Sequence, residues 1–176
     1  EYDELAALTR FAAVAIGAGH LPRHRVALLD PGERNEWYSA SARYADAVVH
    51  DVLPALGAAV SVRGAPAGMG TSLGALAMLH VQRRHPCALG ALFLQSGSFF
   101  MPRFDAHEAR FPRYRRVVRF VGATLRTGAH VNPVPVTLTC GSAEENVHNN
   151  RVMARALSMQ GYPAALHEVS DLHNYT

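Results

Sequence analysis

Residues 67–77 read AGMGTSLGALA, and this stretch decides the expected fold. The Gly- and Ala-rich residues 60–69 have the length and composition of a weak strand, and residues 73–81 are apolar enough for a buried helix. The segment therefore lies where a strand is expected to turn sharply into a helix.

Residues 70–74, GTSLG, fit the pattern G-x-S-x-G of a serine nucleophile at such a turn. Ser72 has to adopt a strained backbone conformation there, and we expect Gly70 and Gly74 to remove β-carbons that would collide with neighbouring elements. The helix beginning at Leu73 would point its positive end toward the site, where an oxyanion develops. The same letters also occur in ordinary turns, so the pattern needs partners elsewhere in the chain.

Strand and helix patterns alternate along the chain. Strand patterns cover residues 24–30, 60–69, 88–95, 134–140 and 164–169, and helical patterns cover residues 5–16, 38–56, 73–81, 117–125 and 145–160. This alternation predicts an α/β fold, with a mostly parallel sheet, right-handed crossovers and helices on both faces. The length of 176 residues corresponds to a single domain, residues 1–176.

Composition excludes several classes of protein. The hydrophobic fraction of 49% is too high for a disordered chain, and no apolar run reaches the ~18 residues of a membrane span. Two cysteines far apart exclude a disulfide-built fold and a cysteine zinc site. All 17 basic residues are arginine, but the net charge is only +3, and the cluster within residues 110–119 fits a solvated helix face better than a nucleic-acid surface. We expect no nucleic-acid partner.

A nucleophilic serine needs a base, and the base needs an acid to orient it. With a G-x-S-x-G turn, the acid and then the histidine follow later in the sequence. Glu144 follows the 134–140 strand pattern, and His173 follows the last strand pattern, so both lie where parallel sheets carry their sites. Glu145 and Asp171 remain alternatives for the acid.

Several motifs together resemble the esterase family of α/β-hydrolases that contains enterochelin esterase, esterase D (S-formylglutathione hydrolase), feruloyl esterases and mycolyltransferases. The segments that carry the resemblance are residues 17–22, 34–38, 51–54, 68–74, 95–100, 140–146 and 171–175. The enterochelin-esterase branch is the most similar.

The resemblance implies an α/β-hydrolase fold and a serine carboxylic-ester hydrolase that acts through an acyl-enzyme. Ser72 would be the nucleophile, Glu144 the acid and His173 the base, and the N–H of Leu73 would be one oxyanion donor. The partner would be a small-molecule ester, and neither a metal nor an organic cofactor would be needed. An acyltransferase with the same triad and a non-catalytic binding module of the same fold are the alternatives.

The resemblance also implies roles for residues outside the triad. Arg34 and Glu36 would lie near the mouth of the substrate site, or would form a structural ion pair. Phe99 and Phe100 would line an acyl pocket, although core packing is an equal alternative for one of them. Leu172 stands where the family often has glycine, and the spacing from Arg34 to Glu36 is one residue tighter than usual; both departures concern the substrate rather than the triad.

The resemblance also implies elements that the sequence does not contain. The family has a strand before residue 1 whose following loop supplies the second oxyanion donor, and a helix after the histidine loop. We therefore expect these 176 residues to be part of a longer polypeptide. No signal-peptide pattern is visible, and a cytoplasmic location is the default expectation.

Overall fold

The computed structural model describes residues 7–61 and 63–173, and the chain divides into two compact units. The described part of the smaller unit runs to Asp30, and the larger unit is Pro31–His173. The larger unit contains the four-stranded sheet and the residues of the expected site. The prediction of a single domain over residues 1–176 stays a prediction.

The smaller unit contains one helix, α1 (Leu8–Gly17), followed by chain without regular structure. The strand predicted over residues 24–30 is wrong, because these residues form no ladder with any described strand. Val26 is 50% exposed and Leu28 is 56% exposed. An apolar run of strand length becomes a strand only when a neighbouring strand satisfies its N–H and C=O groups.

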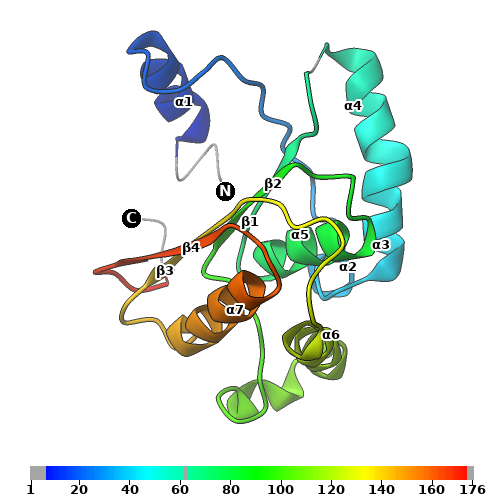
Figure 1. Cartoon of the computed structure of the whole chain (residues 1–176), viewed down its shortest axis with the longest axis vertical. Helices are drawn as coiled ribbons and strands as arrows, with labels where there is room; N and C mark the ends of the chain where they lie inside the picture. Colours follow the sequence, from blue (N-terminus) through cyan, green and yellow to red (C-terminus); the bar gives the residue numbers. More distant parts are fainter. Residues whose placement is uncertain (1–6, 62, 174–176) are drawn as a thin grey trace. The chain divides into compact units, whose positions relative to one another are not determined.

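The larger unit is built on a parallel sheet, as predicted. Its strands are β1 (Ala67–Thr71), β2 (Ala91–Gln95), β3 (Val136–Gly141) and β4 (Ala164–Val169), which lie side by side in this order (Figure 1). Gly70 pairs with Leu94, Leu94 with Leu138, and Leu138 with Leu166. The carboxyl ends of the strands therefore meet at one edge of the sheet.

The core lies on one face of this sheet. Leu92, Leu94, Val136 and Leu138 are buried there, while the residues between them are only partly covered. The covering helices are α5 (Leu73–Arg84), α6 (Tyr114–Arg126) and α7 (Val147–Met159). Helix α5 packs on β1 and β2, α7 packs on β3 and β4, and α6 contacts α7. Periodic apolar residues thus place each helix between two successive strands, as βαβ units require.

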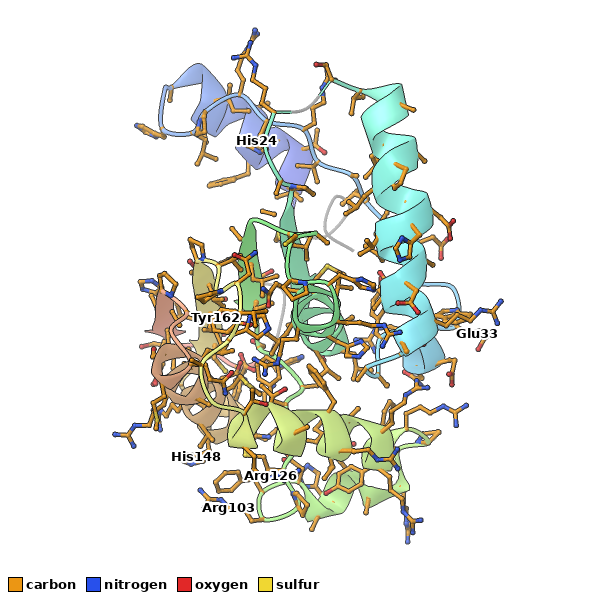
Figure 2. All side chains as sticks on the ribbon, turned by 45° about the vertical axis from the view of Figure 1, so that its right-hand side comes forward. His24, Glu33, Arg103, Arg126, His148 and Tyr162 are labelled. Atoms are coloured by element: carbon orange, nitrogen blue, oxygen red, sulfur yellow. The ribbon has the colours of Figure 1, made fainter. Side chains whose placement is uncertain are left out.

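A buried polar network ties α5 to the segments around β3 and α7. The hydroxyl of Tyr162, which is labelled in Figure 2, donates to Gln82 Oε1 at 2.7 Å, and Gln82 Nε2 donates to the carbonyl of Asn132 at 3.0 Å. Both side chains are almost fully buried. Because a buried polar group without a partner costs about 1–3 kcal/mol, this network fixes how these segments pack.

Two short helical segments lie earlier in the chain than the helices that follow them, an α-helical one before α3 (Ala42–Ala47) and a 3₁₀ one before α6. They are α2 (Arg34–Trp37) and the 3₁₀ helix η2 (Ala106–Arg110). Both contribute residues to the wall of the site described below.

The helix predicted over residues 38–56 is a continuous set of three segments. These are α3 (Ala42–Ala47), the π-helical turn η1 (Val48–Val52) and α4 (Leu53–Ala59). As expected for an N-cap, the Ser41 hydroxyl accepts the N–H of Tyr44. Pro54 has no N–H to donate to the preceding turn, and the wider π turn, in which Leu53 N–H reaches the Val48 carbonyl, ends just before it.

None of the helices in the described ranges combines the length and the apolar character that crossing a bilayer requires.

Candidate active site

Ser72 lies at the turn between β1 and α5 and has φ 57° and ψ −120°. This is a costly conformation for a residue with a side chain, and it is the strain that the G-x-S-x-G pattern predicts. The turn is held because Ser72 N–H donates to the carbonyl of Gln95, at the end of β2, at 2.9 Å. The serine hydroxyl is thereby presented at the carboxyl edge of the sheet.

The two glycines of the motif have different roles. A β-carbon on Gly70 would lie 2.3 Å from the backbone carbon of Gly74, which no L side chain tolerates. A β-carbon on Gly74 itself would meet only the Tyr38 ring, at 3.8 Å, which is an ordinary contact. The expectation that Gly74 also avoids a collision is therefore wrong. The backbone of residue 74 matters because Gly70 packs directly against it.

The hydroxyl of Ser72 has a partner that sequence reasoning missed. Its Oγ lies 2.9 Å from Oγ of Ser98, and Ser98 N–H donates to the Ser72 carbonyl at 3.2 Å. Ser98 follows β2 and is 6% exposed. The sequence could have indicated this contact, because residues 95–98 read QSGS and place Ser98 just after β2, the strand next to β1.

Glu144 is the carboxylate that meets His173. Its Oε2 lies 2.8 Å from Nδ1 of His173, and its side chain is only 2% exposed. The two alternatives are placed differently: Glu145 has a side chain that is 73% exposed, and Asp171 accepts the N–H of Leu172. The position of Glu144 in a loop after a strand and its burial beside His173 both favour it over Glu145 and Asp171 as the acid.

Glu144 is held in its charged form by its hydrogen bonds. Burial alone would raise the pKa of this carboxyl, but bonds from the Ser96 hydroxyl, His173 and the N–H of Gly141 outweigh it and lower the pKa below the usual range. Ser96 Oγ and Gly141 N both donate to Oε1 at 2.6 Å, which leaves Oε2 for the imidazole. An ionised, fixed carboxylate can orient a histidine and stabilise its protonated form.

A cavity of about 240 Å³ lies beside Ser72, Ser98 and His173, whereas Glu144 is not among its lining residues. It is lined by Arg34, Asn35, Ser72, Leu73, Ser98, Phe100, Asp105, His107, Glu108, Phe111, Glu145, Asn146 and His173. Ser72 and His173 share this cavity but are not hydrogen-bonded to each other, since the serine hydroxyl is turned to Ser98. Leu73 opens α5, so its N–H has no acceptor within the helix, and the residue lines the same cavity.

The remaining sequence candidates divide between the cavity and its surroundings. Arg34 lines the cavity, whereas Glu36 does not, because its carboxylate is hydrogen-bonded to Arg113 and Arg116. Phe99 is completely buried in the core, and Phe100 takes the place at the cavity wall. Adjacent side chains point in different directions after β2, so only one of the two phenylalanines reaches the cavity. The sequence alone did not reveal which of them it is.

Solved structures of several esterases are similar in fold to this chain. The enterobactin esterase from Shigella flexneri is 16% identical, with a TM-score of 0.76 over 98% of this chain and 45% of that chain. A ferulic acid esterase is 16% identical, with a TM-score of 0.75 over 99% of this chain and 73% of that one. An S-formylglutathione hydrolase from Staphylococcus aureus is 14% identical, with a TM-score of 0.51 over 77% and 57%.

The chain has an α/β-hydrolase fold. It spans less than half the length of the Shigella enzyme. No family model matches the sequence, and no curated protein matches it at the level required for significance.

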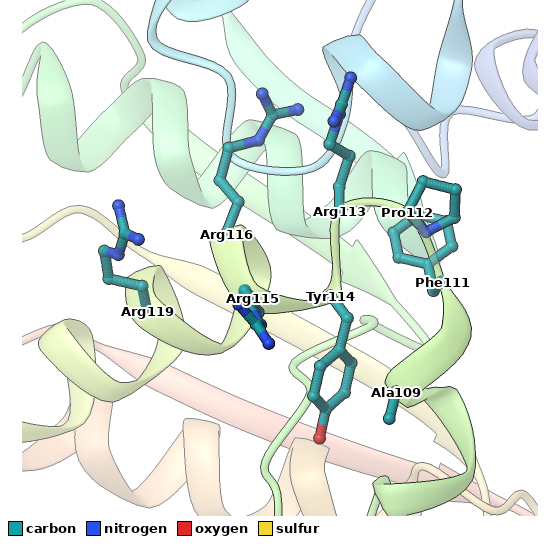
Figure 3. A pocket seen from close by; sticks show the side chains of 8 residues that line it. All are labelled: Ala109, Phe111, Pro112, Arg113, Tyr114, Arg115, Arg116 and Arg119. Atoms are coloured by element: carbon teal, nitrogen blue, oxygen red, sulfur yellow. The ribbon is translucent and has the colours of Figure 1, made fainter.

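The hydrolase fold also contains a second, larger cavity of about 340 Å³ beside α6. It is lined by Ala109, Phe111, Pro112, Arg113, Tyr114, Arg115, Arg116 and Arg119 (Figure 3). Ser72, Glu144 and His173 are not part of this lining. The arginine cluster seen in the sequence therefore lies outside the candidate active site, and two of its members form the ion pairs with Glu36.

Proposed function

We propose that the chain carries the catalytic centre of a serine carboxylic-ester hydrolase. The observation that carries the proposal is the 2.8 Å contact between His173 Nδ1 and the buried Glu144, at a cavity that also contains the strained Ser72. The hydrogen bond on Nδ1 leaves Nε2 as the atom that receives a proton. The fold shared with esterases is consistent with this chemistry.

In the proposed reaction, Ser72 Oγ attacks the ester carbonyl carbon while its proton passes to Nε2 of His173. The electron pair of the carbonyl moves onto oxygen, and the N–H of Leu73 donates to this oxyanion. Collapse expels the alcohol, which takes the proton from His173, and leaves an acyl-enzyme. A water molecule then repeats the sequence, releasing the acid and restoring the Ser72 hydroxyl.

The cavity favours esters with an aromatic acyl group. The rings of Phe100 and Phe111 both line it and lie edge to face, 6.0 Å apart. The guanidinium of Arg34 provides a cation at the same wall. The Shigella enzyme was solved with 2,3-dihydroxy-N-benzoyl-glycine, and another similar structure is named for ferulic acid. We extend the proposal to such esters.

Covalent labelling with a fluorophosphonate tests the nucleophile directly. We expect labelling of the unaltered chain and none of Ser72→Ala. Ser142→Ala is the matched control, because Ser142 is an exposed serine two residues before Glu144 and does not line the cavity. Equal labelling of Ser72→Ala would remove Ser72 as the nucleophile.

A panel of aryl and alkyl esters then tests the reaction. We expect Glu144→Gln to lower kcat by about 10⁴-fold and His173→Ala by up to about 10⁶-fold, as loss of the corresponding triad members does elsewhere. Transfer of the acyl group to added alcohols in preference to water would instead indicate an acyltransferase.

A further inference from the structure

Three possible metal ligands converge at the wall of the cavity that contains Ser72. His107 Nε2 lies 3.8 Å from Oε1 of Glu108 and 3.6 Å from Oε2 of Glu145. The donor atoms of all three side chains lie within 4.8 Å of one another. His107 and Glu108 belong to η2, and Glu145 precedes α7, so the fold and not the local sequence brings them together.

These spacings fit a tetrahedral ion. Two ligands at the usual ~2.1 Å from a tetrahedral metal are about 3.4 Å apart, whereas octahedral neighbours are about 3.0 Å apart. The distances of 3.6 and 3.8 Å from His107 to the two carboxylates are close to the tetrahedral value. The ligand oxygens of Glu108 and Glu145 lie within 4.8 Å of each other. The Glu145 side chain is 73% exposed, so it can rotate and bring its carboxylate closer to that of Glu108.

This wall of the cavity has more oxygen acceptors than cations. The lining contains three carboxylates, from Asp105, Glu108 and Glu145, one guanidinium, from Arg34, and two imidazoles, from His107 and His173. Behind Asp105, Asn149 is completely buried; its Nδ2 donates to Asp105 at 2.7 Å, and its Oδ1 has no donor among the described residues. Glu108 and Glu145 have no arginine partner in the described part of the chain. Both carboxylates contact His107, which carries at most one positive charge against their two negative charges, so a bound divalent cation would add a favourable interaction to this group.

A second group of similar composition, Asp46, His50 and His85, provides a contrast. There Arg84 donates to both carboxylate oxygens of Asp46, at 2.6 and 3.0 Å, and His85 donates or accepts at 2.8 Å. The guanidinium already neutralises this carboxylate and lowers its pKa to about 2. A metal ion would have to displace it, so this group is better explained as an ion pair that braces α3 against α5.

We propose that His107, Glu108 and Glu145 bind a divalent transition-metal ion of the Zn²⁺ type at the wall of this cavity. One imidazole and two carboxylates supply three ligands, and a tetrahedral ion then has a fourth position for water or a substrate atom. An ion held there would offer a ligand position to oxygen atoms of a substrate. The metal site does not depend on the hydrolase proposal, because Ser72, Glu144 and His173 are not among its ligands.

The test is calorimetric titration of the 176-residue chain with Zn²⁺. We expect one saturable site per chain, with affinity reduced at least about tenfold in His107→Ala and in Glu145→Gln. The matched control is His50→Ala, which should leave the affinity unchanged. The Ser72→Ala chain should bind Zn²⁺ as the unaltered chain does, so loss of esterase activity and loss of metal binding are separable. An excess of Mg²⁺ should not displace Zn²⁺, because a tetrahedral site with an imidazole ligand disfavours it.

Three results would overturn the proposal. They are the absence of saturable Zn²⁺ binding, equal affinity in His107→Ala and the unaltered chain, and loss of the site in His50→Ala alone. Because His107 and Glu145 are exposed, circular dichroism of their variants should match that of the unaltered chain. The second of these results, if it is combined with weaker Zn²⁺ binding by Glu145→Gln, would indicate attraction to surface carboxylates only.

Discussion

At the scale of single residues, the loop after β2 holds the candidate site together. Ser96 and Ser98 point to different partners: Ser96 donates to Glu144, and Ser98 contacts Ser72. Asn150 fixes the loop between them, because its Oδ1 accepts the N–H of Gly97 and its Nδ2 donates to the Gly97 carbonyl. One short loop therefore contacts both the nucleophile and the acid of the proposed triad.

Substitution of Ser96 separates a hydrogen bond from backbone strain. Ser96 has φ 46°, in the left-handed region. Ser96→Ala loses the bond to buried Glu144 and keeps the strain, so we expect a loss of about 1–3 kcal/mol in the free energy of unfolding. Ser96→Gly loses the same bond but relieves the strain, so it should be less destabilising by about 1 kcal/mol. Urea denaturation of both variants checks this; a glycine variant as unstable as the alanine variant would contradict it.

Gly70 and Gly74 form a second matched pair. We expect Gly70→Ala to destabilise the chain by about 3 kcal/mol or more, because its β-carbon would lie 2.3 Å from the Gly74 backbone. Gly74→Ala should be neutral or stabilising by up to about 1 kcal/mol, since position 74 is helical and has room. Thermal denaturation distinguishes the two, and similar losses in both would show that the turn is not limited by this contact.

At the scale of elements, α5 carries a partly buried histidine, His80, whose ring contacts α6. The ring of His80 meets that of Phe120 edge to face, with centroids 4.9 Å apart. Burial first, and then the charges of Arg84 and Arg116, lower the pKa of His80 to about 4. His80 is therefore neutral in the folded chain at pH 7.

The packing of α5 against α6 should weaken in acid. Because the folded pKa of His80 is about 4 and the unfolded value is 6.5, the unfolded chain binds more protons between these values, and stability falls as the pH falls from 6.5 toward 4. The loss attributable to this side chain should be about 1–2 kcal/mol, less than the full shift implies because the ring is partly exposed. Urea denaturation at pH 7 and pH 5 should show a smaller difference for His80→Phe than for the unaltered chain. Equal differences would contradict the assignment.

At the scale of the whole molecule, the two compact units differ in how their backbone is satisfied. Strands β1 to β4 are joined by continuous parallel ladders. Residues 24–30 of the smaller unit form no described ladder and are exposed along their length. Stability is therefore unevenly distributed along the chain.

Hydrogen exchange measures this difference. We expect amides of residues 24–30 to exchange within seconds, while those of β2 and β3, the two central strands, are protected until global unfolding. Mass spectrometry of peptic fragments from the 176-residue chain provides the measurement. Protection of residues 24–30 comparable to that of β2 would show that they form a strand in solution.

Sequence patterns correctly predicted the helices and strands of the larger unit that pack on their neighbours in sequence order. The last strand, residues 164–169, has the predicted bounds, and the helices that became α5, α6 and α7 each overlap their predicted ranges. The patterns failed at residues 24–30, because a strand depends on a neighbour that local composition does not reveal. They also could not assign Phe99 to the core and Phe100 to the cavity, which depends on chain direction after β2.

The order of motifs by itself determined Ser72 as the candidate nucleophile and His173 as the candidate base, and it limited the acid to Glu144, Glu145 or Asp171, because a tight glycine turn and two loops beyond later strands leave few places for these residues. Only the tertiary structure decided that Glu144 and not Glu145 meets the imidazole, that Ser98 is hydrogen-bonded to Ser72, and that His107 faces Glu145. The physical reason is that burial, hydrogen-bond geometry and the meeting of distant loops depend on the packing of the whole sheet, which no local pattern contains.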